Sequence, residues 1–307
     1  MNTRVPFTSG SLAESVAAVS ARALASGALL PIPTGFEFVD DGGMRFFVRV
    51  LANLRRKDAA RAEQRRAAAG EPVNPFLPYE QALFVADVSE SHVAILNKFN
   101  VVERHLLIVT REFEDQRALL TPRDFAAWWR CLHEYESLGF YNGGSEAGAS
   151  QPHKHLQLVP LPLAPQGPPV PIAPLLDAVR QGAGSGAIPG FDFVHAFSRL
   201  DAAADERYAA REAYERYAAM LAQVGLDPPA VRGTDLQSGP YCLLATRAWL
   251  LLVPRSREFF GSISINSLGF AGTLLVRDEE QLLALRATGP LAALRETAVA
   301  LPKGGAA

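Results

Sequence analysis

The chain has few cysteines, little net charge and no long apolar run. Its 307 residues include only two cysteines, Cys131 and Cys242, which are too few for a disulfide framework or a four-thiolate metal site and fit the reducing cytoplasm. A net charge of −2 excludes the overall basic field that attracts nucleic acid or anionic lipid. No apolar run, even around 248–253, is long enough to span a membrane. Recognition of an anion must therefore rely on local groups.

Hydrophobic residues make up 49 % of the chain, which is enough for a large core. Helix and strand patterns follow each other without regular βαβ alternation, which favours an α+β fold with an antiparallel sheet and flanking helices over a doubly wound sheet. The N-terminal stretch lacks the basic start, apolar block and cleavage site of a signal peptide. The expected elements, in chain order, are a helix within 12–30, a hairpin turning at 41–43, antiparallel strands within 82–109, a helix from Thr121 to Gly139, strands at 155–160 and 191–197, a helix over 201–224, a strand pair within 241–256 and two short helices after Asp278.

A stretch rich in proline and glycine, 164–190, is the best candidate for a connection between two halves. It separates an N-terminal half, 1–163, from a C-terminal half, 191–307. The segment "HLLIVTREFE" from His105 resembles "WLLLVPRSREFF" from Trp249, which indicates that the two halves are related. A charged stretch before the first proline cluster, "RRKDAARAEQRRAAAG", is predicted to be a solvated helix or loop.

Two of the six histidines, His153 and His155, stand two residues apart and are followed at the same spacing by Gln157. The stretch 155–160 is predicted to be a strand, in which alternate side chains share one face. The three side chains are then expected on one face and Lys154 on the other. Three interpretations are open: a half-buried strand with a solvated polar face, a zinc site that would need a third ligand, or a nucleophilic histidine.

The stretch before these histidines could supply hydrogen-bond donors for an anion. A neutral imidazole beside such a cradle can take up a phosphoryl-type group and divide one difficult displacement into two easier ones. The carboxylate of Glu146, which lies within this stretch, would have to point away from the bound anion. The cradle would consist of backbone N–H groups of residues with small or absent side chains, which are Gly143, Gly144, Gly148, Ala149 and Ser150.

The segment "YNGGSEAGASQPHKHLQLVP" resembles the active-site segment of ATP adenylyltransferases, also called diadenosine tetraphosphate phosphorylases, in the histidine triad superfamily. Further segments follow the family's pattern in the same order, so that the resemblance covers about residues 35–280. They are "NPFLP", "HVAILNKFNVVERHLLIVTREFEDQ" and "YCLLATRAWLLLVPRSREFFGSISINSLGFAGTLLV". The resemblance implies a histidine-triad-like fold and a nucleotidyltransferase acting on diadenosine tetraphosphate.

The resemblance also implies a reaction and the residues that carry it out. A histidine attacks the α-phosphate, expels ATP and holds AMP as a phosphoramidate until phosphate takes it away as ADP. By its position in the motif the nucleophile is His155, flanked by His153 and Gln157. The positions that match the family's substrate contacts are Lys57, Asn97, Lys98, Asn142, Gly148, Ala149, Ser150 and Gln151, together with Ser264, Ile265, Asn266, Thr273 and Arg277 in the C-terminal half.

Several of these substrate contacts have a structural alternative. The residues around Lys57 depart from the family's pattern, so its alignment could slip. Asn142 could cap a turn and Asn266 could satisfy a loop backbone. Lys98 and Arg277 could be solvated.

Gln157 distinguishes between two types of reaction. A neutral amide can donate to a nonbridging phosphate oxygen but cannot protonate a leaving group at pH 7, which favours transfer between good leaving groups over hydrolysis. The expected partners are small nucleotides and phosphate, without nucleic acid or membrane, and the chain is expected to be a monomer or a small homo-oligomer. A divalent cation, Mg²⁺ or Mn²⁺, is expected to arrive on the polyphosphate and not in a protein cage.

Two other functions remain open. A hexose-1-phosphate nucleotidylyltransferase of the same superfamily uses a related strand, but its pattern places proline where this chain has Lys154, and its zinc cysteines are missing here. A non-catalytic nucleotide sensor would keep the pocket and lack turnover. A turnover assay separates the sensor from the enzymes.

Overall fold

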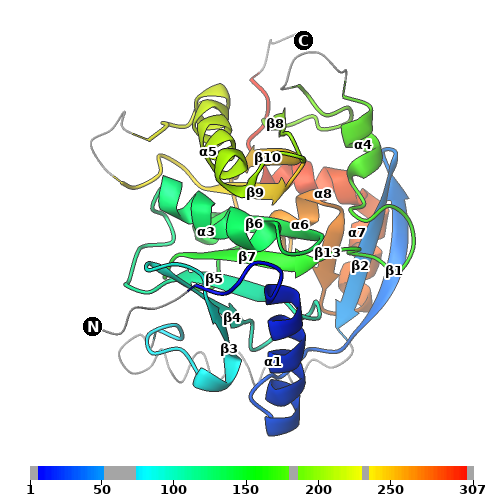
Figure 1. Ribbon diagram of the computed structural model, residues 1–307. Helices are drawn as coiled ribbons and strands as arrows, with labels where there is room; N and C mark the ends of the chain where they lie inside the picture. Colours follow the sequence, from blue (N-terminus) through cyan, green and yellow to red (C-terminus); the bar gives the residue numbers. More distant parts are fainter. Residues whose placement is uncertain (1–5, 52–73, 180–185, 230–234, 303–307) are drawn as a thin grey trace.

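An eight-stranded sheet, built by both halves of the chain, lies at the centre of the computed structural model, which describes residues 6–51, 74–179, 186–229 and 235–302 (Figure 1). The strand order is β3-β4-β5-β7-β6-β9-β10-β8, and every neighbouring pair is antiparallel. The halves meet where β6 pairs with β9. The strands are β3 (Phe84–Asp87), β4 (His92–Leu96), β5 (Leu106–Thr110), β6 (Ser137–Gly143), β7 (His155–Pro160), β8 (Ala196–Arg199), β9 (Tyr241–Thr246) and β10 (Trp249–Pro254).

Three long helices cover one face of this sheet, the face turned to the viewer in Figure 1. They are α1 (Leu12–Ser26), α3 (Pro122–Leu132) and α5 (Glu206–Gln223). Their apolar side chains and those of the sheet, such as Leu156 and Leu158 of β7, form one buried core. Because both sheet faces are buried, β4 and β5 read as continuous apolar runs.

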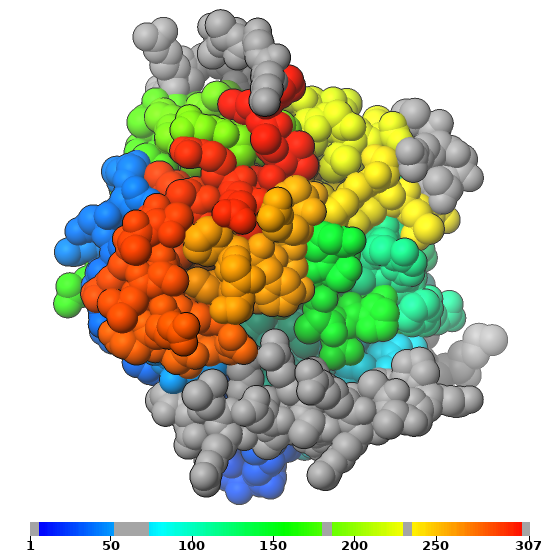
Figure 2. All heavy atoms as spheres, turned by 180° about the vertical axis from the view of Figure 1, so that it is seen from behind, coloured from blue at the N-terminus to red at the C-terminus, as the bar shows by residue number. Residues whose placement is uncertain are grey.

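A second core fills the space between the other face of the sheet and the C-terminal elements, which cover the back of the molecule in orange and red (Figure 2). A three-stranded sheet of order β1-β2-β13, which joins two N-terminal strands to one C-terminal strand, contributes to the same core. Its strands are β1 (Thr34–Asp41), β2 (Met44–Leu51) and β13 (Thr273–Val276); the remaining elements are η1 (Gln81–Leu83), η2 (Ser145–Ala147), β11 (Phe259–Phe260), β12 (Ile263–Ser264), α4 (Ala173–Asp177), α6 (Ser267–Phe270), α7 (Glu279–Thr288) and α8 (Pro290–Thr297).

Most of the predicted elements are confirmed, including the α+β architecture. The hairpin turns where predicted, because Gly42 and Gly43 both adopt the positive φ that a tight two-residue turn requires. The repeated segments at His105 and Trp249 form β5 and β10, which both lie inside the large sheet. The predicted strand 191–197 is shorter and later, since β8 begins only at Ala196.

The helix that was predicted to end at Gly139 is the clearest error. Its start is correct, with the reciprocal Thr121 and Asp124 capping box and Pro122 in the first turn. The helix ends at Leu132, and Gly139 lies in β6, where a Cβ atom would come within 2.5 Å of Trp128 Nε1. Gly139 therefore allows β6 to lie close to α3 and does not end a helix.

The described helices contain none that is long and apolar enough to cross a membrane. The charged stretch around Lys57 lies outside the described residues, so its predicted helix or loop stays a prediction.

Candidate active site

The alternation predicted for β7 is confirmed. Lys154 points toward the helix layer, where its Nζ lies 3.3 Å from Asp124 Oδ2 of α3, and the next alternate side chains join the core on that side. His155 and Gln157 therefore point to the opposite face. This face is not solvated, because His155 is only 4 % exposed and Gln157 7 %. The interpretation as a half-buried strand with a wet polar face is wrong.

His155 is held as a neutral imidazole, and within the described part of the chain no hydrogen bond reaches its Nε2. Its Nδ1 donates to the backbone carbonyl of His153 at 2.8 Å, which leaves the lone pair on Nε2. Burial lowers the pKa of His155 to about 4, so the ring carries no proton on Nε2 at neutral pH. An uncharged imidazole with a free Nε2 is the form that can act as a nucleophile.

Gln116 fixes the strand at His155, although it is not among the site residues predicted from the sequence. The backbone N–H of His155 donates to Gln116 Oε1 at 2.9 Å, while Gln116 Nε2 donates to the carbonyl of Asn142 at 2.8 Å. A single buried amide thus ties His155 to the end of β6. Gln116 is the last residue of one of the segments that resemble the family. That position is the one feature of the sequence that could have indicated a role for Gln116 in the site.

His153 has both ring nitrogens occupied. Asn74 Nδ2 lies 2.8 Å from its Nδ1, and Thr110 Oγ1 lies 2.8 Å from its Nε2. The ring of Phe76 lies against both histidines, with centroid distances of 5.6 Å to His153 and 5.4 Å to His155. The "NPF" sequence therefore packs against the histidine strand. Among contacts between described residues, both nitrogens of His153 are bonded, whereas only Nδ1 of His155 is.

Gln157 has a buried histidine, His105, as its partner, and His105 is likewise absent from the site residues predicted from the sequence. His105 Nε2 lies 3.0 Å from Gln157 Oε1, and His105 Nδ1 lies 3.1 Å from Asn97 Nδ2. Burial lowers the pKa of His105 to about 4. Asn97 is expected to contact substrate, but its side-chain nitrogen faces His105.

The glycine-rich loop before β7 meets the C-terminal half. Gly148 has φ of 90°, and a Cβ atom there would lie 2.8 Å from Asn266 Cβ and 3.3 Å from the carbonyl oxygen of Ile265. The structure therefore brings together two groups of predicted site residues that are more than a hundred positions apart. Glu146 is exposed, but its Oε2 accepts a hydrogen bond from Ser145 Oγ and would lie 3.7 Å from a Cβ atom at Gly144, so its carboxylate stays beside the loop and does not point away as the cradle would require.

The two asparagines predicted as contacts also serve the fold. Asn142 Oδ1 accepts from the backbone N–H of Ser267 at 3.0 Å and from its hydroxyl at 2.6 Å. Asn266 Oδ1 accepts from the backbone N–H of Leu268 and so caps α6. Their oxygens are occupied, so a contact of either side chain with substrate would use its Nδ2 group.

The remaining predicted contacts are less tightly grouped. Lys98 Nζ lies 2.9 Å from Glu80 Oε2 in a partly exposed ion pair. Thr273 and Arg277 lie at and just after β13, and their Oγ1 and Nε atoms are buried without a hydrogen-bond partner. Within the described residues, no hydrogen bond joins these two to β7. Ala149, Ser150 and Gln151 lie between the glycine loop and β7, Ser264 donates to Glu258, and Lys57 is outside the described residues.

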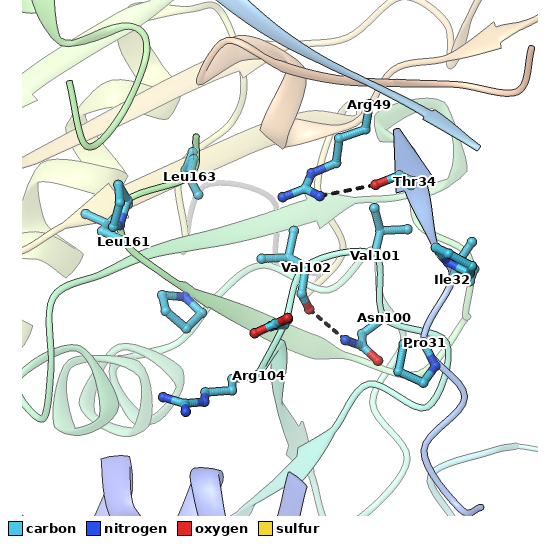
Figure 3. A pocket seen from close by; sticks show the side chains of 14 residues that line it. Pro31, Ile32, Thr34, Arg49, Asn100, Val101, Val102, Arg104, Leu161 and Leu163 are labelled. Atoms are coloured by element: carbon cyan, nitrogen blue, oxygen red, sulfur yellow. Dashed lines mark hydrogen bonds between the residues drawn. The ribbon is translucent and has the colours of Figure 1, made fainter. Parts of the chain in front are cut away.

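A cavity of about 580 Å³ opens at the far end of β7, beside Pro160 (Figure 3). Arg49 of β2 extends into it and donates to Thr34 Oγ1 at 3.3 Å, while Asn100 donates to the carbonyl of Val102 at 2.9 Å. The glycine loop precedes β7, so this cavity and the loop lie at opposite ends of the strand. Among the described residues no group of three His, Cys, Asp or Glu side chains is placed to hold a metal ion.

Comparison with known proteins identifies similar sequences and a similar fold. The sequence models of the Ap4A phosphorylase N-terminal domain and the ATP adenylyltransferase C-terminal domain match residues 2–178 and 189–300. The chain is 29% identical over 236 residues to diadenosine 5',5'''-P1,P4-tetraphosphate phosphorylase 2 of Saccharomyces cerevisiae, which is 68% of this chain and 70% of the relative.

Two solved structures of a yeast protein share the fold. The crystal structure of yeast Ap4A phosphorylase Apa2 has a TM-score of 0.73 at 23% identity and covers 96% of both chains. The crystal structure of the same protein in complex with Ap4A has a TM-score of 0.70 at 23% identity and covers 94% of this chain and 97% of that one. At this level of identity the likeness establishes the α+β fold.

Proposed function

The chain belongs to the Ap4A phosphorylase family, and from this premise we propose that it transfers the adenylyl group of diadenosine tetraphosphate (Ap4A) to phosphate. The reaction is that of a nucleotidyltransferase. Relatedness to the yeast phosphorylase 2 in sequence supports the proposal, and the arrangement of β7 supplies its chemistry.

The observation that carries the proposal is the buried, neutral His155 with its Nδ1 bound to a carbonyl. Its Nε2 lone pair attacks the α-phosphorus of Ap4A, a P–N bond forms, and the P–O bond to the β-phosphate breaks with release of ATP. An oxygen of inorganic phosphate then attacks the same phosphorus, the P–N bond breaks, and ADP leaves with the imidazole restored. The leaving group is ATP in the first step and the neutral imidazole in the second. Neither needs a proton to depart, so the neutral amide of Gln157 suffices at its position.

Product analysis tests this function directly. With Ap4A and phosphate, chromatography is expected to show equal amounts of ATP and ADP. Without phosphate, the reaction is expected to stop after one ATP is released for each active site, because the adenylylated histidine has no acceptor. Two molecules of ADP from each Ap4A, or an equal steady rate without phosphate, would contradict the proposal. A non-catalytic sensor would release no ATP at all.

We further propose that Mg²⁺ or Mn²⁺ accompanies the polyphosphate into the site. Ap4A carries four phosphates, and a predicted cationic contact, Lys98, is already paired with Glu80. Excess chelator is expected to lower kcat at least tenfold, and added Mg²⁺ is expected to restore it. Full activity in chelator would contradict this role, as would one tightly bound zinc ion per chain in metal analysis of the purified protein.

A further inference from the structure

A chain of three side chains runs from the β4–β5 turn to the catalytic strand. Asn97 follows β4, His105 precedes β5, and Gln157 lies in the middle of β7. The backbone N–H of Asn97 donates to the carbonyl of His105 at 2.9 Å, so the two residues are held opposite each other at the base of the turn. Their side chains continue the connection to Gln157 through contacts of 3.1 Å and 3.0 Å.

The direction of each hydrogen bond in this chain follows from its first member. The backbone N–H of Phe99 donates to Asn97 Oδ1 at 3.3 Å, so the nitrogen of the amide must face His105. His105 Nδ1 then accepts. Because burial keeps His105 neutral, its single proton lies on Nε2 and is donated to Gln157 Oε1. The oxygen end of Gln157 is thereby occupied.

Gln157 therefore offers only its Nε2 donor group to the space in front of the strand. An amide has nearly the same shape in its two flipped orientations, and only a fixed partner separates them. In the flipped orientation, Oε1 would face a negatively charged phosphate oxygen. We propose that His105, held by Asn97, is a positioning residue that keeps the donor end of Gln157 toward the α-phosphate. This role rests on the proposed adenylyl transfer.

The expected consequence is a loss in rate and not in affinity. A donor aimed at a phosphate oxygen gains strength as charge develops in the transition state, and removal of one such donor costs about 100-fold to 1,000-fold in kcat in other enzymes. His105→Phe keeps a planar ring beside Phe140, whose centroid is 5.6 Å away, but removes both nitrogens. We expect the rate of adenylyl-enzyme formation from Ap4A to fall about 10-fold to 100-fold, with KM changing less than about threefold.

A double-mutant cycle with Gln157→Ala distinguishes positioning from a structural role. If His105 acts through the amide of Gln157, His105→Phe should cause almost no further loss once that amide is gone. The urea midpoint of each variant identifies any that fails to fold. A full additional loss of 10-fold or more in the Gln157→Ala background would overturn the proposal, because His105 would then act on the fold or on another group.

Nitrogen NMR of the wild-type protein tests the same chain without any activity measurement. The ¹⁵N shifts of His105 are expected to show protonated Nε2 and unprotonated Nδ1 between pH 5.5 and 8. A proton on Nδ1, or titration near the ordinary histidine value of about 6.5, would overturn the proposed chain. Absence of an AMP adduct in a wild-type protein with the expected tautomer would instead show that the proposed adenylyl transfer is wrong, and with it this role of His105.

Discussion

His155→Ala is expected to abolish turnover, with a loss in kcat on the order of 10⁴-fold or more, while the protein keeps its fold. Removal of a covalent nucleophile commonly costs this much, since only binding and oriented donors remain. The fold should survive because the side-chain hydrogen bond of the imidazole goes to the carbonyl of His153, two residues away. The measurement is steady-state phosphorolysis of Ap4A together with circular dichroism and a urea unfolding curve.

Neighbouring variants and a trapped intermediate make this result specific. His153→Ala should be milder, because both nitrogens of His153 already bond to the protein, and Gln157→Ala should slow transfer without abolishing nucleotide binding. Labelled Ap4A without phosphate is expected to leave an AMP adduct that is labile in acid and stable in base, as a phosphoramidate is. An adduct that persists in His155→Ala, or that maps to His153, would contradict the assignment.

The rate of this first step should also show the low pKa of His155. Protonation of Nε2 removes the attacking lone pair, so the rate is expected to be flat from pH 8 to about 5 and to fall as the pH approaches the pKa of about 4. Adduct formation is measured without the phosphate acceptor, whose own ionisation near neutral pH would otherwise contribute. A midpoint near the ordinary histidine value of about 6.5 would show that the ring is less buried than described.

The sequence predicts the catalytic strand well because its pattern is local. A period of two places His155 and Gln157 on one face without knowledge of anything else, and the motif resemblance selects His155 as the nucleophile. The partners that fix these side chains are not local. Gln116 and His105 reach β7 from 39 and 52 residues away in the chain, and no spacing rule connects such positions.

Elements whose role depends on a distant neighbour were predicted less well. In the sequence, Gly139 has the position and residue type typical of a helix end. In the structure, glycine is required there because the ring of Trp128 packs against it and leaves no space for a Cβ atom. Asn142 and Asn266 each use the side-chain oxygen to hold α6, while the predicted substrate contact through Nδ2 stays a prediction. For Gly139 and Asn142 the competing requirement is tertiary, so propensity and periodicity could not reveal it, whereas the capping bond of Asn266 is local and was open as an alternative from the sequence.

Behind the catalytic face, Lys154 lies in a buried network of charges. It is 1 % exposed, and its Nζ lies 2.6 Å from Glu114 Oε2 and 3.3 Å from Asp124 Oδ2. His92 Nε2 lies 2.9 Å from the other oxygen of Asp124. Burial by itself would raise the pKa of Asp124, but the hydrogen bond from His92 and the charge of Lys154 hold that pKa down at about 2. The carboxylate is therefore ionised and depends on these partners.

This network also explains why a proline at the position of Lys154, as in the hexose-1-phosphate pattern, does not suit this chain. The backbone N–H of Lys154 donates to the carbonyl of Glu114 at 2.7 Å, and proline has no such donor. Its charged side chain and its backbone thus both connect the strand between the two histidines to the segment that carries Gln116.

Lys154→Met should therefore lower the free energy of unfolding by about 3–5 kcal/mol, because it leaves the buried carboxylate of Asp124 without its cationic neighbour. The matched control is Lys98→Met, which removes the same charge from an ion pair exposed by 34 % at the lysine and is expected to cost less than about 1 kcal/mol. Urea unfolding at pH 7 measures both. Similar losses in the two variants would show that the network around Asp124 contributes no more than a surface pair, and that packing alone holds the strand beneath His155.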